Sequence, residues 1–291
     1  MENLDKLAMI VRLETTQWRP RVSDAMLRRQ LAEQNSGDLS SFGATKLLAQ
    51  REEISQITKA VSDLMTYHYQ HTAPWFDRGS RMLPCTLFLD YQTHMQYAIL
   101  RIKDAVSDVS ETLPEIKELA KQRLNGAFKD SDYPTPEDFR AAYTFRAAYR
   151  PLPKADDFRV ELIGEAAADE IRAEIEAETK AQVRESVRDC YLRLYGAVEH
   201  MAEKLTAYDP TTKGADRGTF RDSLVGNVRE LVEILPHMAH AVGDAALDAL
   251  CREAAALTAH TPETLRVDAP VRQTTAGAAR AILAKMEGYC G

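Results

Sequence analysis

The chain lacks three features that would assign it quickly to a class. Its four cysteines are scattered without any C-x-x-C spacing, so neither a disulfide framework nor a zinc knuckle is indicated. No apolar run approaches the roughly 20 residues that span a bilayer, and the N-terminus lacks the basic-then-apolar layout of a signal peptide. We therefore expect free thiols and a soluble cytoplasmic protein.

Signatures of common enzyme chemistry are also missing. There is no glycine-rich phosphate loop and no H-E-x-x-H motif. His68 with His71, and His237 with His240, could each present two imidazoles to a metal, but two histidines are an incomplete ligand set. Cys85 lies in an apolar setting, which raises the pKa of a thiol and disfavours a nucleophile. The sequence thus predicts a non-enzymatic protein with no catalytic residues, no cofactor and no metal.

Charge and length set further bounds. The net charge of -7 and the isoelectric point near 5.6 argue against a protein that coats duplex DNA or an anionic membrane with its whole surface. With 291 residues, 45% of them hydrophobic, the chain can bury a real core. The length favours one elongated domain with one or two smaller ones.

The longest helical pattern runs from about Glu165 to Tyr208. Its first half is highly charged and indicates a solvated helix. Its second half carries apolar residues at alternating steps of four and three, the seam of a coiled coil. The seam residues are Val187, Tyr191, Leu194, Val198, Met201, Leu205 and Tyr208. This helix therefore needs partners, which we expect to be two more long helices, at about Thr45 to His68 and Thr86 to Leu124, the latter with a kink or restart near Pro114.

Strand patterns occur at two places. Residues 7–18 are rich in β-branched side chains and alternate from Met9 onward, which predicts a strand. The repeat D-F-R-A-A-Y-T-F-R-A-A-Y-R, from Asp138 to Arg150, has a spacing of six that suits a strand, with aromatic residues on one face and arginines on the other. With F-R-V-E-L-I at 158–163 it would form an antiparallel hairpin, and the N-terminal strand is its natural third member.

The remaining pattern separates a C-terminal unit. The run D-P-T-T-K-G-A-D-R-G holds a proline and two glycines and indicates a linker at 209–218. Three amphipathic helical patterns follow it. We therefore predict a mainly α fold, with a small antiparallel sheet and a long antiparallel, coiled-coil-like helical stalk in residues 1–208 and a C-terminal helical bundle in residues 219–291.

Several ordered residues resemble a known family. They are Trp18-Arg19, Pro74-Trp75 with Gly79, Arg81, Leu83 and Pro84, Tyr133-Pro134 to Phe139 and Phe145, and Phe220-Arg221-Asp222-Ser223 with Asn227, Leu231 and Pro236. The chain resembles an uncharacterised protein family of bacteriophages and integrative mobile elements, without assigned activity. Its members are neighbours of MoxR-type AAA+ ATPases, so the resemblance implies a bacterial host cell and an AAA+ ATPase as partner.

Two functions remain open at this point. The first is a non-enzymatic protein-interaction or adaptor protein, with homo-oligomerisation also open. The alternative is a single-stranded nucleic-acid-binding protein, because arginines beside aromatic rings suit phosphate and base stacking. The rings and the arginines fall on opposite faces of the expected hairpin, which favours the first. The candidate interaction residues are Arg19, Arg21, Trp75, Arg78, Arg81, Arg140, Arg146, Arg150 and Arg159.

Overall fold

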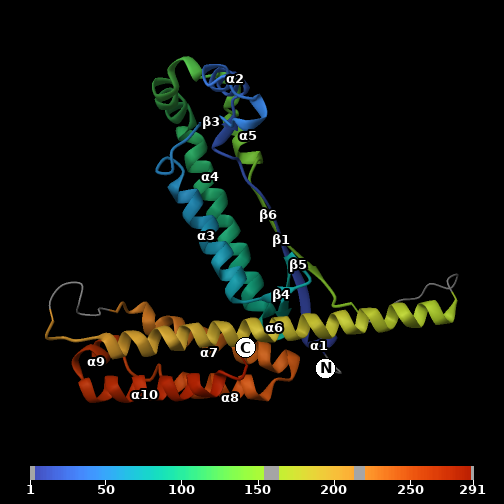
Figure 1. The fold of residues 1–291 in the computed structure, drawn as a ribbon, viewed down its shortest axis with the longest axis vertical. Coiled ribbons are helices and arrows are strands. Elements are labelled where there is room, and N and C mark those ends of the chain that lie inside the picture. Colours follow the sequence, from blue (N-terminus) through green and yellow to red (C-terminus); the bar gives the residue numbers. More distant parts are fainter. Residues whose placement is uncertain (1–3, 154–163, 213–219, 290–291) are drawn as a thin grey trace. The chain divides into compact units, whose positions relative to one another are not determined.

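The computed structural model describes residues 4–153, 164–212 and 220–289, without the side chains of Asp77 and Arg78. It is mainly helical with a small antiparallel sheet (Figure 1). The helices are α1 Leu4–Leu7, α2 Ala25–Gln34, α3 Ser55–Gln70, α4 Phe88–Leu124, α5 Pro136–Ala141, α6 Glu165–Ala207, α7 Ser223–Val242, α8 Ala245–Ala256, α9 Pro262–Val267 and α10 Ala269–Met286. The strands are β1 Ala8–Thr16, β2 Arg21–Ser23, β3 Thr45–Leu47, β4 Ala73–Trp75, β5 Asp77–Pro84 and β6 Thr144–Arg150. Short 3-10 turns lie at Leu39–Ser41, Cys85–Leu87, Asn125–Ala127 and Asp130–Asp132.

The chain divides into two compact units. Unit 1 comprises Met1–Arg12, Tyr69–Tyr91 and Tyr149–Gly291, and unit 2 comprises Leu13–His68 and Gln92–Ala148. A division into domains at residues 209–218 stays a prediction, and residues 213–219 lie outside the described part.

The four-stranded sheet has the order β4-β5-β1-β6. β1 pairs antiparallel with β5, from Ala8 opposite Pro84 to Arg12 opposite Ser80. β4 and β5 form a tight hairpin that turns at Phe76, where φ is 46°. The strand predicted for residues 7–18 is therefore confirmed. β4 and β5, on either side of the turn at Phe76, were not predicted.

The prediction of a single strand from Asp138 to Arg150 was wrong in nearly its first half. Residues 136–141 form α5, and β6 begins only at Thr144. The cause is an N-terminal cap: Thr135 Oγ1 accepts a hydrogen bond of 3.1 Å from the Asp138 amide, and Pro136 occupies the first turn, both strong helix-start features. Residues 158–163, the expected second strand of a hairpin, lie outside the described residues.

Two expected helix limits also need correction. The helix expected from Thr45 begins at Ser55, because Thr45–Leu47 instead pair as β3 with β2. α4 continues through Pro114 as one helix, so the expected restart there is absent from the described chain. Leu113 and Ile116, on either side of the proline, are both buried, and this burial stabilises the helix where one backbone donor is lost.

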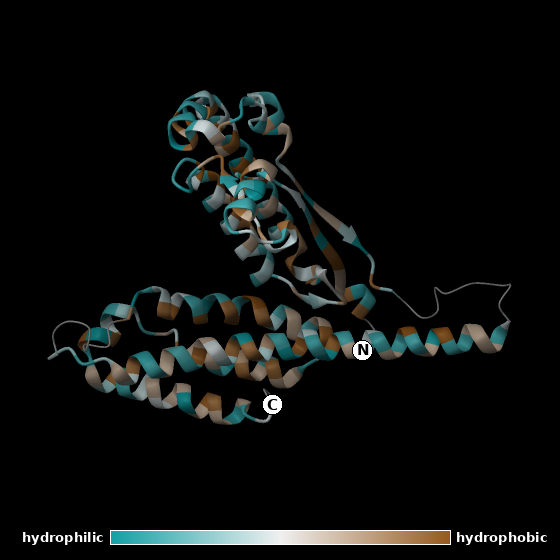
Figure 2. Cartoon of the chain, turned by 45° about the horizontal axis from the view of Figure 1, so that its top comes forward, coloured by the Kyte–Doolittle hydropathy of each residue, from teal (hydrophilic) through white to brown (hydrophobic). Residues whose placement is uncertain are grey.

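Unit 1 is built on α6. Figure 1 shows α6, α7, α8 and α10 side by side, and α6 packs on α7 and α10. Of the predicted seam, every residue except the half-buried Val187 is buried. Within unit 1 the seam therefore packs on α7 and α10, partners that the sequence did not predict. In Figure 2 hydrophilic positions interrupt hydrophobic ones along the N-terminal half of α6, where Glu174 is exposed.

The turn between α7 and α8 is fixed by backbone geometry and a cap. Gly243 adopts φ 75° at the end of α7, a conformation that glycine accepts without a steric penalty. Asp244 then caps α8 by accepting hydrogen bonds from the amides of Ala246 and Leu247. Tyr191 of α6 also donates to the Asp244 carboxylate, at 3.2 Å. This hydroxyl therefore ties α6 to the start of α8.

Unit 2 contains a buried cation, Lys46. Lys46 Nζ lies 3.1 Å from Asp24 and 2.6 Å from Asp132, and it donates to the Ala127 carbonyl. Burial alone would lower the pKa of Lys46, but the contacts with Asp132 and Asp24 raise it. Hydrogen bonds from the Leu27 amide and from Lys46 hold the pKa of Asp24 below its ordinary value. This cluster holds the β2–β3 ribbon against the chain that follows α4.

Replacing Asp24 with Asn should make the stability of unit 2 less sensitive to acid. Asn retains the cap of α2 but loses the charge that faces Lys46. Because the folded pKa of Asp24 is depressed, its stabilisation is present above about pH 4 and is lost as the pH falls through the folded pKa. The difference in melting temperature between parent and D24N should therefore shrink from pH 5 to pH 2. The exposed Asp63→Asn serves as the control, and a difference that stays constant with pH for D24N would contradict the assignment.

Candidate functional site

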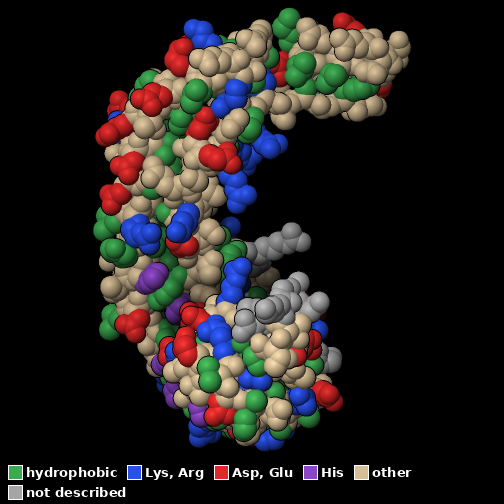
Figure 3. Space-filling model, turned by 90° about the vertical axis from the view of Figure 1, so that its left-hand side faces the viewer, with side chains coloured by type: hydrophobic (Ala, Val, Ile, Leu, Met, Phe, Trp, Pro, Cys, Tyr) green, Lys and Arg blue, Asp and Glu red, His purple; other side chains and the backbone are tan. Residues whose placement is uncertain are grey.

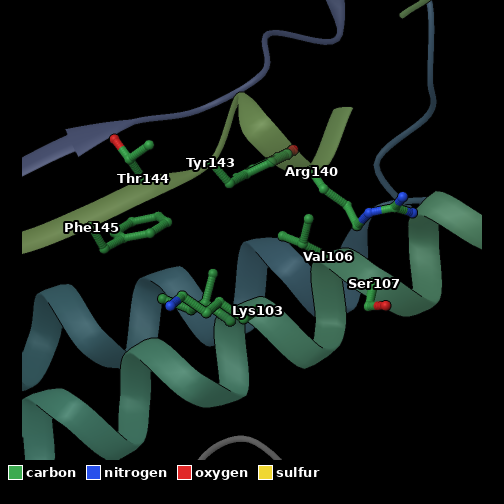
Figure 4. A pocket seen from close by; sticks show the side chains of 8 residues that line it. Lys103, Val106, Ser107, Arg140, Tyr143, Thr144 and Phe145 are labelled. Atoms are coloured by element: carbon green, nitrogen blue, oxygen red, sulfur yellow. The ribbon is translucent and has the colours of Figure 1, made fainter. Parts of the chain in front are cut away.

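A cavity of about 520 Å³ lies in unit 2 between α4 and the segment from α5 to β6. We call it the α4–β6 cavity. It is lined by Ile102, Lys103, Val106 and Ser107 of α4 and by Arg140, Tyr143, Thr144 and Phe145 (Figure 4). The α4 residues are consecutive pairs one turn apart, so they share one side of the helix.

The opposite wall is positioned by Phe139. This ring is fully buried in α5 and makes edge contacts with Trp18 and Tyr143, with centroids 5.2 Å apart in both pairs. Tyr143 lies in the short junction between α5 and β6, where burial raises its pKa to about 12. Its hydroxyl is therefore protonated at neutral pH. Thr144 turns toward β1, where its Oγ1 hydrogen-bonds Thr16 Oγ1 at 2.7 Å.

The charge of the cavity has one sign. Lys103 and Arg140 line it, and no carboxylate does. Arg140 Nη1 donates to the buried Ser110 Oγ at 2.8 Å, which fixes the guanidinium. Neither cation forms an ion pair of 4.0 Å or less with another residue that the structure describes. Figure 4 shows them at opposite ends, with Lys103 below Phe145 and Arg140 beyond Ser107 and Val106.

The other side of α4 forms a groove with α3. This groove, the α3–α4 groove, has a volume of about 330 Å³ and is lined by Gln56, Lys59, Ala60, Arg101, Asp104, Ala105 and Asp108. Tyr97 and Leu100 lie one turn before Arg101 and Asp104 on the same face of α4. They are 63% and 56% exposed. One face of α4 therefore carries two exposed apolar side chains, followed one turn later by residues of both charges that line the groove.

The candidate arginines in unit 2 are separated by the structure. Arg140 lines the α4–β6 cavity. Arg146 lies on β6 with 77% of its side chain exposed, 3.9 Å from Glu14. Arg19 and Arg21 are exposed around the start of β2. These side chains thus do not form a single arginine face, because α5 places Arg140 on a helix instead of a strand.

Among the candidate interaction residues in unit 1, Trp75 and Arg81 take part in packing and hydrogen bonds within the unit. Trp75 is buried in β4, so its ring is not a surface contact. Arg81 donates to the hydroxyl and carbonyl oxygens of Thr72 and lies over the Tyr69 ring; burial and the nearby Arg193 lower its pKa. Arg150 is exposed at the end of β6. The side chain of Arg78, and all of Arg159, lie outside the described residues.

The histidines and cysteines considered as candidate site residues lie in local packing or hydrogen-bonding environments. His68 is buried, and His237 Nδ1 lies 2.9 Å from Thr86 Oγ1. In the described chain no three His, Cys, Asp or Glu side chains gather as a metal site. Cys85, Cys190 and Cys251 are free thiols. Burial raises the pKa of all three, to about 12 for Cys190 and Cys251.

Comparison with known proteins identified no related protein. No family model, no curated protein and no solved structure matches the chain. Among the described helices, none is both long enough and apolar enough to cross a membrane. The site is therefore interpreted from its own geometry.

Sequence reasoning missed several residues of these sites. Lys103, Tyr97 and Leu100 all lie on one long helix. Lys103 joins the α4–β6 cavity and Tyr97 and Leu100 lie beside the α3–α4 groove only once the segment from α5 to β6 and α3 pack on different sides of α4. Their helical spacing was visible in the sequence, but its partners were not. The start of α5 had a readable signal in Thr135-Pro136-Glu137-Asp138, a cap with proline and acidic residues in the first turn.

Proposed function

We propose that this protein is a non-enzymatic adaptor that binds a helix of a partner protein in the α3–α4 groove. The observation that carries the proposal is the pair Tyr97 and Leu100, two large apolar side chains mostly exposed on α4. Adjacent exposed apolar residues with a charged rim are typical of interaction sites. A partner helix would cover them with its own apolar face.

The groove beside these residues suits such a helix. Ala60 of α3 and Ala105 of α4 are small, so a partner backbone can approach closely between the helices. Lys59 and Arg101 lie with Asp104 and Asp108 along the same groove. Such mixed charges give orientation to a docked helix and contribute specificity more than affinity. An AAA+ ATPase is the partner that the sequence resemblance favours.

The alternative of single-strand nucleic-acid binding has less support. Stacking needs exposed rings beside the cations, but in the repeat that suggested this alternative Phe139 is fully buried and Phe145 is half-buried in the cavity wall. Figure 3 shows acidic and basic side chains interspersed on the face that it presents. A mixed surface of this kind favours protein contacts over a phosphate backbone.

A double variant tests the adaptor role. Y97E with L100E should abolish capture of the partner while leaving the free energy of unfolding within about 0.5 kcal/mol, because both side chains are exposed. The measurement is affinity capture from bacterial lysate with an amine-reactive cross-linker, since Lys59 in the groove should link to the partner. Mass spectrometry then identifies the linked peptide.

The matched control is Met26→Glu, another mostly exposed apolar residue of unit 2. It should retain both the capture and the Lys59 cross-link. Capture that is equal in the double variant and the parent would contradict the proposal. Nucleic acid in place of protein in the captured material, released steeply by added salt, would favour the alternative.

A further inference from the structure

The α4–β6 cavity has the size and walls of a small-molecule site. Its volume of about 520 Å³ falls within the roughly 300–1,000 Å³ of such sites, which combine apolar walls with few polar groups. The rings of Tyr143 and Phe145 lie across from Val106 of α4 (Figure 4), and Ile102 also lines the cavity. The middle of the cavity therefore favours an apolar body.

The ends of the cavity differ from its middle. Lys103 reaches below Phe145 at one end, and Arg140 lies at the other, near Ser107 (Figure 4). The bond from Arg140 to Ser110 uses one nitrogen, Nη1. The guanidinium has further N–H donors, and its planar fork matches a carboxylate. Both residues are exposed, so each cation is accessible to an anionic group of a ligand, and only a ligand with an anionic group at each end would pair with both.

We propose that the α4–β6 cavity binds a small molecule with an apolar middle and a carboxylate at each end. One carboxylate pairs with Arg140 and is oriented by the Ser110 anchor, and the other pairs with Lys103. Ile102, Val106, Tyr143 and Phe145 bury the middle. The site goes beyond the adaptor role and is independent of it, because the α4–β6 cavity and the α3–α4 groove are lined by different residues of α4.

Isothermal titration calorimetry with straight-chain dicarboxylates of increasing length, and with monocarboxylates of equal length, tests the assignment. The best-fitting dicarboxylate should bind roughly tenfold or more tightly than its monocarboxylate, the gain expected from one further charge-assisted contact. Lys103→Gln and Arg140→Gln should each remove this advantage. K103Q replaces an exposed side chain with no ion pair among the described residues, so it keeps the test valid even if R140Q disturbs α5.

Arg146→Gln is the matched control, because Arg146 is exposed on β6 and does not line the cavity. It should leave the dicarboxylate affinity unchanged. The proposal is overturned if no acid binds, if the two series bind equally, or if R146Q weakens binding as much as K103Q, which would indicate attraction to surface charge alone.

Discussion

Replacing Phe139 with Ala should destabilise unit 2 by about 3–5 kcal/mol, the usual cost of truncating a buried phenylalanine. The ring is fully buried in α5 and contacts both Trp18 and Tyr143. Its loss removes apolar contact area and leaves a cavity that α5 cannot fill without shifting. Because a domain of ordinary stability has about 5–15 kcal/mol in total, much of unit 2 would be unfolded or frayed.

The measurement must distinguish the two units. Urea denaturation followed by hydrogen exchange and mass spectrometry reports each segment separately. Peptides from Leu13–His68 and Gln92–Ala148 should lose protection at lower urea, whereas those from α7 and α10 should not. Phe145→Ala is the control, since this ring is half-buried and should cost less. A larger cost at Phe145 than at Phe139 would show that the buried ring has been misassigned.

The contrast between these two phenylalanines shows where sequence patterns reach their limit. A period of two places Phe139 and Phe145 on one face of a strand. The repeat alone is therefore as compatible with one continuous strand as with the helix and strand of the structure. The local cap at Thr135, with Pro136 after it, decides in favour of a helix up to Ala141. From Thr144 onward the strand prediction is confirmed. Local capping thus outweighs the repeat at its start.

The long helices were predictable because their period extends over many turns. α6 follows the expected limits within one residue at its C-terminal end, and α4 begins two residues later than expected. What a helix packs against depends on chain topology, which periodicity does not contain. The same limit applies to the sites: Arg140 was a candidate from the sequence, while Lys103 resembled any lysine on a solvated helix face. Only the placement of the segment from α5 to β6 beside α4 brings them to one cavity.

Replacing Val198 with Asp should strongly destabilise unit 1. Val198 is fully buried in the seam of α6, with buried Leu194 and Met201 one turn away on either side. A carboxylate at this position has no partner in an apolar seam, so it must either be protonated or carry a desolvation cost of several kcal/mol. Thermal melting should show a large fall in the transition of unit 1, and the fall should be smaller at low pH, where the carboxyl group is neutral.

Glu174→Lys provides the comparison within the same helix. Glu174 is exposed in the N-terminal half of α6. Reversing its charge should therefore change the free energy of unfolding by no more than about 0.5 kcal/mol and leave the melting temperature nearly unchanged. Hydrogen exchange should also show that V198D loosens α7 and α10, since α6 packs on both. Equal effects at positions 198 and 174 would mean that α6 is held equally along its length and has no buried seam. Loss of protection confined to α6 would mean that α7 and α10 fold independently of it.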